Sequence, residues 1–295
     1  MENGNRLSRL RRQAHRWWWA VVERLDRPGR RWLLVLPASL WVSVAQRAPC
    51  LVHWRDGAWI HHYRGAKIPH ASLGRASPPA VFTAEARELF LYGYTPRPGD
   101  TVFDIGAGIG AETLLFSRLV GRCGRVVSLE AHPRTYERLA RVCKANRLTN
   151  VIPVPAAAAA ADGRLRISDL EHYLHNTVLE TETGGIEVQA RRVDTIAREL
   201  GITSIDLLKM NIEGAERLAI EGLAGIIGST RHVCIGCHDF LADGGGSEQM
   251  RTKALVREFL VEHGFRVTSR DDAPDPWTRD YIYGVNTRMA SSYRQ

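Results

Sequence analysis

Apolar and polar stretches alternate along residues 100–287 in a pattern that predicts strands and helices in turn. Short apolar runs predict seven principal strands: Thr101–Ile105, Arg125–Ala131, Val151–Pro155, Ile205–Ile212, His232–Cys237, Phe265–Ser269 and Tyr281–Val285. Apolar residues at helical spacing predict helices between them, over Ala111–Val120, Pro133–Asn146, Asp194–Leu200, Ala215–Leu223 and Glu248–His263. This alternation is typical of an α/β fold with a mostly parallel sheet and helices on both faces.

Weaker signals lie outside this main pattern. Arg164–Ile167 and Ile186–Arg191 predict two extra strands inserted before the fourth principal strand. Upstream, the stretch Val52–Tyr63 with Asp56-Gly57 inside it predicts a β-hairpin. We therefore predict four parts: a basic, Trp-rich helical extension at 1–48, a lead-in at 49–99 whose hairpin and helix pack on the core, the core domain at 100–287, and a flexible tail at 288–295.

The helical extension combines an apolar stripe with many arginines. Apolar residues recur at helical spacing at Leu7, Leu10, Ala14, Trp17, Trp18, Val21, Val22 and Leu25. Residues 1–31 contain nine Arg against three acidic residues, so they carry +6 of the net charge of +8. A basic amphipathic helix of this kind can lie on an anionic membrane surface, pack its stripe on the rest of the protein, or stay disordered. The sequence leaves these alternatives open.

Composition narrows the class of protein. With 44% apolar and 24% charged residues among 295, the chain is an ordinary folded protein rather than a disordered or collagen-like one. Outside residues 1–31 the net charge is only +2, so we expect no nucleic-acid partner. Five cysteines make no disulfide framework, and no apolar run approaches the roughly 18 residues of a spanning helix. We expect a cytoplasmic protein whose membrane contact, if any, is peripheral.

A glycine-rich loop is the strongest local motif. The strand Thr101–Ile105 contains Asp104 and leads into Gly106-Ala107-Gly108-Ile109-Gly110, after which a helix begins at once. Glycines let the backbone turn sharply and approach a ligand closely, and the helix N-terminus offers free N–H groups. Glu130 ends the next strand, where a carboxylate can accept hydrogen bonds from both hydroxyls of a ribose.

The acidic residue before the loop distinguishes between ligands. A carboxylate at Asp104 suits a ligand with a cationic amino-acid end better than the anionic pyrophosphate of a dinucleotide. The third glycine also comes one residue earlier than in the dinucleotide fingerprint. We therefore predict S-adenosylmethionine as the cofactor. A nicotinamide dinucleotide and a tight turn without a ligand are the alternatives.

The glycine loop and three further segments resemble those of the FkbM-type methyltransferases, over about residues 80–287. The further segments are Ser128–Pro133, Val193–Ile196 and Ile205–Glu216 with its Lys-x-x-x-Glu-Gly-x-Glu pattern. The resemblance implies a Rossmann-like, seven-stranded methyltransferase fold, and methyl transfer from S-adenosylmethionine, usually to a hydroxyl of a sugar, a lipid-linked glycan or a natural product. It implies cofactor contacts at Asp104, Gly106, Gly108 and Glu130, and we add the neighbouring residues Ala107, Gly110 and Ala131.

The resemblance also places Lys209, Asn211 and Glu213 at the carboxyl end of the fourth principal strand, where an open sheet binds its ligand. The family usually has an aspartate where this chain has Asn211. An amide can form hydrogen bonds but cannot serve as an ionised base. A binding protein that keeps the cofactor site but has weakened turnover is therefore a second interpretation. A membrane-surface adaptor acting through residues 1–48 is a third.

Methyl transfer to oxygen needs a group that removes the hydroxyl proton. His238 and Glu213 are the candidate bases, because each follows an apolar strand at the predicted ligand-binding edge. With Asn211 and Lys209 they form the predicted catalytic set. The alternatives are a structural hydrogen bond for His238 and helix capping for Glu213. The cysteine pair before His238 fits a haem-attachment pattern, but it lies on a predicted buried strand, so we expect neither haem nor a metal.

Overall fold

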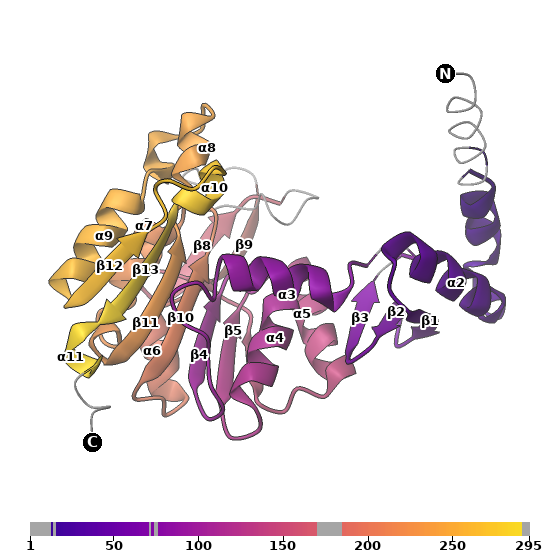
Figure 1. The fold of residues 1–295 in the computed structure, drawn as a ribbon, viewed down its shortest axis with the longest axis horizontal. Helices are drawn as coiled ribbons and strands as arrows, with labels where there is room; N and C mark the ends of the chain where they lie inside the picture. Colours follow the sequence, from indigo (N-terminus) through magenta and orange to yellow (C-terminus); the bar gives the residue numbers. More distant parts are fainter. Residues whose placement is uncertain (1–12, 14–15, 71, 74–75, 170–184, 291–295) are drawn as a thin grey trace. The chain divides into compact units, whose positions relative to one another are not determined.

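The computed structural model describes residues 13, 16–70, 72–73, 76–169 and 185–290 (Figure 1). The chain forms two compact units, which divide between Pro79 and Ala80. The predicted boundaries after residues 48 and 99 do not coincide with this division. Helix α2 (Val35–Gln46) packs on the strand that follows residue 48, and Ala86 and Phe90 belong to a hydrophobic cluster of the second unit.

The first unit combines helices with a small antiparallel sheet. Its elements are a helix at 16–25, the 3₁₀ helix η1 (Arg31–Leu34), α2, and the strands β1 (Cys50–Arg55), β2 (Ala58–Tyr63) and β3 (Ala66–His70). Strands β1 and β2 form the predicted hairpin, whereas β3 was not predicted. The predicted stripe residues Leu7, Leu10 and Ala14 lie outside the described residues.

Two serines of α2 tie this helix to the sheet. The hydroxyl oxygens of Ser39 and Ser43 accept hydrogen bonds from the backbone N–H groups of Val52 and Cys50, at 2.8 and 2.9 Å. These bonds satisfy donors of β1 that have no strand partner on that side. They explain why the helix and the hairpin belong to one unit.

The second unit contains a seven-stranded sheet of order β12-β13-β11-β10-β4-β5-β6, in which β13 is antiparallel to the other six strands. The bounds lie within two residues of the predicted ones: β4 (Thr101–Ile105), β5 (Arg125–Leu129), β6 (Val151–Val154), β10 (Ile205–Asn211), β11 (Thr230–Gly236), β12 (Phe265–Ser269) and β13 (Tyr281–Asn286). The predicted mostly parallel α/β fold is confirmed, and the first unit is its N-terminal helical and β extension.

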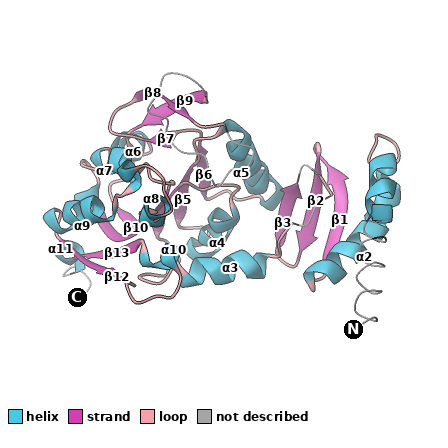
Figure 2. Cartoon of the chain, turned by 90° about the horizontal axis from the view of Figure 1, so that it is seen from above, coloured by secondary structure: helices cyan, strands magenta, loops and turns pink. Residues whose placement is uncertain are grey.

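Helices cover both faces of this sheet (Figure 2). Because successive side chains of a strand point to opposite faces, Phe103 and Leu208 pack with one set of helices, and Val102 and Leu207 pack with the other. The first set is α6 (Val193–Glu199), α7 (Glu216–Glu221) and α9 (Lys253–Glu262), and the second is α3 (Pro79–Glu88), α4 (Ala111–Val120) and α5 (Pro133–Asn146). The predicted helix Glu248–His263 is divided, because the 3₁₀ helix η4 (Glu248–Met250) precedes α9.

Shorter elements complete the second unit. The two predicted extra strands are β8 (Gly163–Ile167) and β9 (Ile186–Arg191), which form a small sheet with β7 (Ala157–Ala158). Within the described residues, the remaining helices are η3 (Ile227–Ser229), α8 (Asp239–Asp243), α10 (Pro276–Arg279) and α11 (Thr287–Ala290). Helix α11 extends into the predicted tail, whose residues 291–295 lie outside the described residues. Within the described ranges, no helix is long and apolar enough to cross a membrane.

A close backbone contact joins β4 to β10. Gly106, which follows β4, has a φ of +74°, and a Cβ atom placed on it would lie 2.0 Å from the carbonyl oxygen of Asn211. A real Cβ cannot approach a backbone oxygen so closely. The loop after β4 can therefore pass the end of β10 in this way because residue 106 is a glycine.

Replacing Gly106 by alanine should destabilise the fold by more than about 3 kcal/mol, because clash and backbone strain act together. Gly201→Ala isolates the strain, since Gly201 has a φ of +64° but nothing within 4 Å, and should cost about 1–2 kcal/mol. Gly228 has neither a positive φ nor an atom within 4 Å of a Cβ placed on it, so Gly228→Ala should change the free energy of unfolding by less than about 0.5 kcal/mol. Urea unfolding measures all three. Equal losses for Gly106→Ala and Gly201→Ala would refute the contact.

Candidate active site

Four neighbouring parallel strands end at one edge of the large sheet. They lie in the order β11-β10-β4-β5 (Figure 1). The glycine loop follows β4, Glu130 follows β5, Asn211 ends β10, and His238 lies just beyond β11. Because carboxyl ends of parallel strands meet at the same edge, the structure brings the predicted cofactor and catalytic residues together there.

Glu130 and the glycine loop are bonded to each other. The backbone N–H of Gly108 donates to Glu130 Oε2 and that of His132 donates to Oε1, both at 2.9 Å. Burial raises the pKa of Glu130 to about 7, although the two N–H donors act in the opposite direction. A carboxylate has about four acceptor positions, so each oxygen keeps room for a hydroxyl donor. Glu130 can therefore hold the loop and a ribose at once.

The other predicted cofactor residues differ in their exposure to solvent. Gly106 and Gly108 are half-buried, whereas Ala107 and Gly110 are buried. A Cβ on Gly110 would lie 2.9 Å from Leu139 Cδ1, so this glycine lets α4 pack against α5. Ala131 packs against the core of the small sheet. These positions support the loop by packing, and their contact with a cofactor stays a prediction.

Asp104 and Lys209 form a buried ion pair beneath the loop. They are register partners on β4 and β10, and Lys209 Nζ lies 3.0 Å from Asp104 Oδ1. The ammonium also donates to the carbonyl oxygen of Gly106 at 2.7 Å, and Thr113 Oγ1 donates to Asp104 Oδ2 at 2.7 Å. We expected this carboxylate to meet the cationic end of a cofactor. In the structure a cation of the chain itself, Lys209, meets it.

Lys209 stays charged in this environment. Burial alone would lower its pKa, but the carboxylates of Asp104 and Glu112 outweigh burial and raise the pKa of Lys209 above its ordinary value. The Phe90 ring, 5.0 Å from Nζ, adds a cation–π contact. Lys209 is therefore a fixed cation that positions the glycine loop, and it is unsuited to accept a proton.

His238 lies between two carboxylates. Its Nε2 is 3.4 Å from Glu213 Oε1 and its Nδ1 is 3.4 Å from Glu216 Oε1. Burial alone would lower the pKa of His238, but Glu216 and Glu213 outweigh burial and raise it above its ordinary value. The two predicted bases thus form one pair. Glu216, fully buried and accepting from Gly214 N at 3.2 Å, orients the imidazole from behind.

Backbone strain marks the same two residues. Among the described residues, five non-glycine residues have a positive φ: Arg47, Asp56, Arg147, Glu213 and His238. The first three end helices or form the hairpin turn, where this conformation is common. Glu213 and His238, each with a φ of 52°, instead follow central strands at the site. Strain of this kind clusters at functional sites, where surrounding contacts maintain it.

Asn211 is held by a residue that the sequence did not point to. Tyr281 Oη, at the start of β13, donates to Asn211 Oδ1 at 3.0 Å. Thr252 was also missed; its hydroxyl lies 2.9 Å from both Glu216 Oε2 and Cys237 O. A third missed residue is Glu112, where burial, with a smaller contribution from Asp104, raises the pKa to about 6. Its position in the first turn after the glycine loop could have indicated it.

The cysteines before His238 are inert in this fold. Cys234 and Cys237 are buried, and burial raises the pKa of Cys237 well above its ordinary value. Within the part of the chain that the structure describes, no group of three His, Cys, Asp or Glu side chains is arranged to hold a metal ion.

Comparison with known families identifies the family of this chain. The methyltransferase FkbM domain matches residues 104–267, which is more than half of the chain. The chain belongs to the FkbM methyltransferase family. The matched segment runs from Asp104 on β4, through the Lys209–Glu216 segment and His238, to β12. The resemblance inferred from the sequence is therefore confirmed.

Individual proteins similar to this FkbM-family chain differ in how much they share with it. The 31-O-demethyl-FK506 methyltransferase FkbM of Streptomyces tacrolimicus is 26% identical over 246 residues, 70% of this chain and 88% of that enzyme. The tRNA (adenine(58)-N(1))-methyltransferase catalytic subunit TRM61 of Yarrowia lipolytica is 42% identical over 57 residues, 19% of this chain and only 15% of that protein. A crystal structure of methyltransferase FkbM from Methylobacillus flagellatus aligns at 17% identity with a TM-score of 0.45, covering 63% of this chain and 43% of that one.

Breaking the buried pair should be costly. Lys209→Met leaves the Asp104 carboxylate buried without a counter-charge and should lower the free energy of unfolding by about 3–5 kcal/mol. Lys209→Met with Asp104→Asn should lose less than the sum of the single changes, with a coupling above about 1 kcal/mol in a urea-unfolding double-mutant cycle. As a control, Arg164→Met breaks the exposed pair with Glu187 and should cost less than about 1 kcal/mol. Additive losses at residues 104 and 209 would contradict the pairing.

Proposed function

We propose that this chain transfers a methyl group from S-adenosylmethionine to a hydroxyl oxygen of a sugar, glycolipid or natural product. The observation that carries the proposal is the location of the Glu213–His238 pair on the same sheet edge as Glu130 and the glycine loop. Membership of the FkbM methyltransferase family supports the reaction class. We propose oxygen as the accepting atom because of the acid–base pair, since a hydroxyl must lose its proton to react.

The charges around the loop fit a cationic cofactor. Glu112 and Glu130 have pKa values raised to about 6 and about 7, chiefly by burial. A cation bound beside them would favour their ionised forms, whereas an anionic pyrophosphate would be repelled. S-adenosylmethionine supplies a methyl group on a positively charged sulfur, which is the electrophile that this reaction needs. Glu130 would hold its ribose, and Gly106 and Gly108 would let the backbone approach it closely.

The chain's own residues then have separate tasks. Glu213 is the more accessible member of the acid–base pair, with 21% of its side chain exposed against 8% for His238. An acceptor hydroxyl placed beside the pair can pass its proton to the unprotonated imidazole or to Glu213. Glu216 orients the ring, and the Asn211 amide, held by Tyr281, offers a neutral hydrogen-bonding group to the acceptor. Lys209 keeps the loop in place.

Cofactor binding is tested by calorimetric titration with S-adenosylmethionine. Glu130→Gln should weaken binding about tenfold or more, because an amide is a poorer acceptor for two ribose hydroxyls than a carboxylate. Since the pKa of Glu130 is raised to about 7, the parent protein should also lose affinity as the pH falls through that value, and Glu130→Gln should not. Glu137→Gln, on an exposed side chain of α5, is the matched control. Equal affinity of both variants and the parent would reject the site.

His238 is tested by nuclear magnetic resonance titration of its imidazole, which requires no acceptor. Because Glu216 and Glu213 raise the pKa of His238, it should titrate above about 6.5, the ordinary value for histidine. Glu216→Gln and Glu213→Gln should each move the titration to lower pH. His232, at the opposite end of β11, has a pKa lowered by burial and should not respond. An unchanged His238 titration in both variants would show that Glu216 and Glu213 do not raise the pKa of His238.

Turnover distinguishes the proposal from the weakened-enzyme alternative. Release of S-adenosylhomocysteine is followed with a panel of sugar, glycolipid and natural-product hydroxyls. His238→Ala should retain cofactor binding and lose turnover by about 10²-fold or more, as expected for removal of a general base. A parent protein that binds the cofactor and methylates no hydroxyl would instead favour a binding protein in which Asn211 has replaced the family aspartate.

A further inference from the structure

Helix α2 is apolar on two opposite sides. Its sequence from Val35 to Gln46 contains no charged residue. Ala38 and Val42 are fully buried on the side that packs against β1. On the opposite side, Leu36 and Leu40 are 78% and 68% exposed. A surface helix of a water-soluble domain normally turns a polar face to solvent, so the outer side of α2 is exceptional.

The outer side forms one continuous surface, which we name the apolar face. It consists of Trp32, Leu33, Leu36, Leu40 and Val44, all exposed and spaced so that they lie along one side of a helix. The other exposed residues of α2 are Pro37 and Ala45, so no exposed residue of this helix is polar. Contiguous exposed apolar patches of this kind mark interaction sites rather than ordinary surface.

The apolar face is not the stripe predicted from the sequence. Trp18 and Trp19 of the helix at 16–25 pack on Trp41 of α2, with ring centroids 5.7 and 6.1 Å from that of Trp41. Val22 of the same stripe is buried, while Trp17 and Val21 remain exposed. Among the described residues of the stripe, Trp18 therefore packs on α2, whereas the apolar face belongs chiefly to α2 itself.

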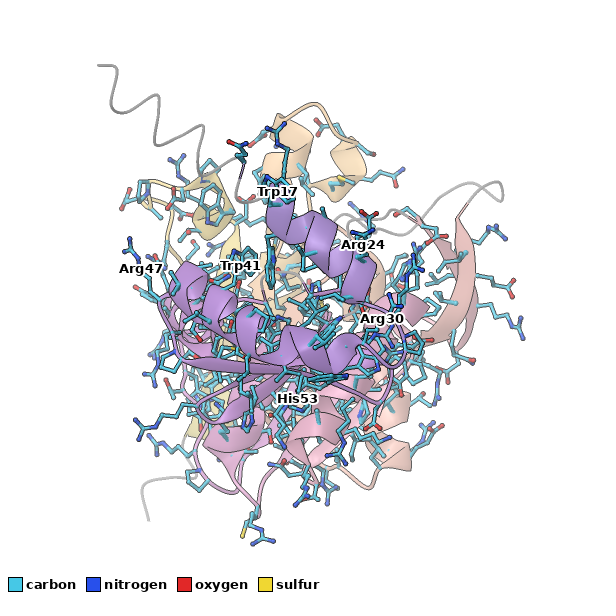
Figure 3. The ribbon with its side chains drawn as sticks, turned by 90° about the vertical axis from the view of Figure 1, so that its right-hand side faces the viewer. Trp17, Arg24, Arg30, Trp41, Arg47 and His53 are labelled. Carbon is cyan, nitrogen blue, oxygen red and sulfur yellow. The ribbon has the colours of Figure 1, made fainter. Side chains whose placement is uncertain are left out.

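Positive charge surrounds the apolar face. Arg30 and Arg47 lie near opposite ends of α2, and Arg24 lies on the preceding helix (Figure 3). All three are exposed. The described part of the first unit has nine Lys and Arg residues against three acidic ones, and one of these, Asp26, already pairs with Arg31. An aliphatic strip with arginines at both ends matches the interface of an anionic bilayer, where apolar side chains enter the acyl boundary and arginines reach the phosphates.

We infer that the apolar face docks the chain on an anionic lipid bilayer, with α2 lying in the plane of the interface. At 12 residues, or about 18 Å, α2 is too short to span the membrane. The indole N–H of Trp32 is the one hydrogen-bonding group among the side chains of the face, whereas protein interfaces carry about one hydrogen bond per 100–200 Å². The excess of positive charge selects an anionic partner. The inference goes beyond methyl transfer and does not depend on it.

The test is co-sedimentation of the full chain with vesicles of phosphatidylcholine, with and without phosphatidylglycerol. The parent should bind the anionic vesicles, and added salt should weaken the binding. Leu36→Ser with Leu40→Ser should weaken it by about tenfold or more, because apolar burial is lost without a change in charge. Arg30→Gln with Arg47→Gln should cost about fivefold per arginine, and only on anionic vesicles.

Val81→Ser with Val261→Ser is the matched control, because these valines of the second unit are 53% and 57% exposed. It should leave vesicle binding unchanged. Thermal unfolding verifies that each variant is folded, as expected for substitutions of exposed side chains. The inference would be overturned if the parent protein did not bind anionic vesicles. It would also be overturned if the variant with Leu36→Ser and Leu40→Ser bound them as tightly as the parent. A further contradicting result would be a parent protein that is a dimer and an α2 variant that is a monomer but still binds vesicles. A second copy of the chain would then cover the apolar face.

Discussion

The buried contact between Asp104 and Lys209 is the interaction on which the site depends. It joins register partners on adjacent central strands, and its ammonium also holds the carbonyl oxygen of Gly106. Gly106 in turn lies against the backbone of Asn211. One cation therefore fixes the end of β4, the end of β10 and the loop between the sheet and α4. Because a buried charge is tolerated only with its partner, neither residue can change alone without disturbing all three.

The balance of buried charges also governs the rest of the sheet edge where the parallel strands end. Four carboxylates, Glu112, Glu130, Glu213 and Glu216, lie near the ends of these strands, and the cationic groups that contact or face them in the described residues are Lys209 and the imidazole of His238. Lys209 is already committed to Asp104. Positive charge is therefore in short supply: burial raises the pKa values of Glu112 and Glu130, and Glu216 and Glu213 outweigh burial and raise that of His238. A cationic ligand relieves that shortage, and an anionic one increases it.

Local pattern predicted most of the fold, because strand alternation and helical spacing are properties of neighbouring residues. The edge could also be predicted, since parallel strands place the residues after their carboxyl ends together. The partner of Asp104 could not, because Lys209 is distant in sequence and only strand register brings it opposite. Glu216 lay within a recognised motif, yet its role depends on where His238 points. The division that we predicted after residue 48 separates α2 from β1, although two serine bonds join them, because such bonds leave no pattern in the sequence.

The activities proposed for the two units are complementary whatever their relative placement. A surface on the first unit that holds the chain at a bilayer confines the second unit to a thin layer above the lipid. An acceptor carried on a lipid is confined to the same layer, so each encounters the other at a high effective concentration. Under that condition the acceptor pocket needs little binding energy of its own, and its contacts can serve orientation of the hydroxyl toward the methyl donor. A freely diffusing acceptor would gain nothing from the apolar face, so its presence favours the lipid-linked member of the proposed acceptor classes.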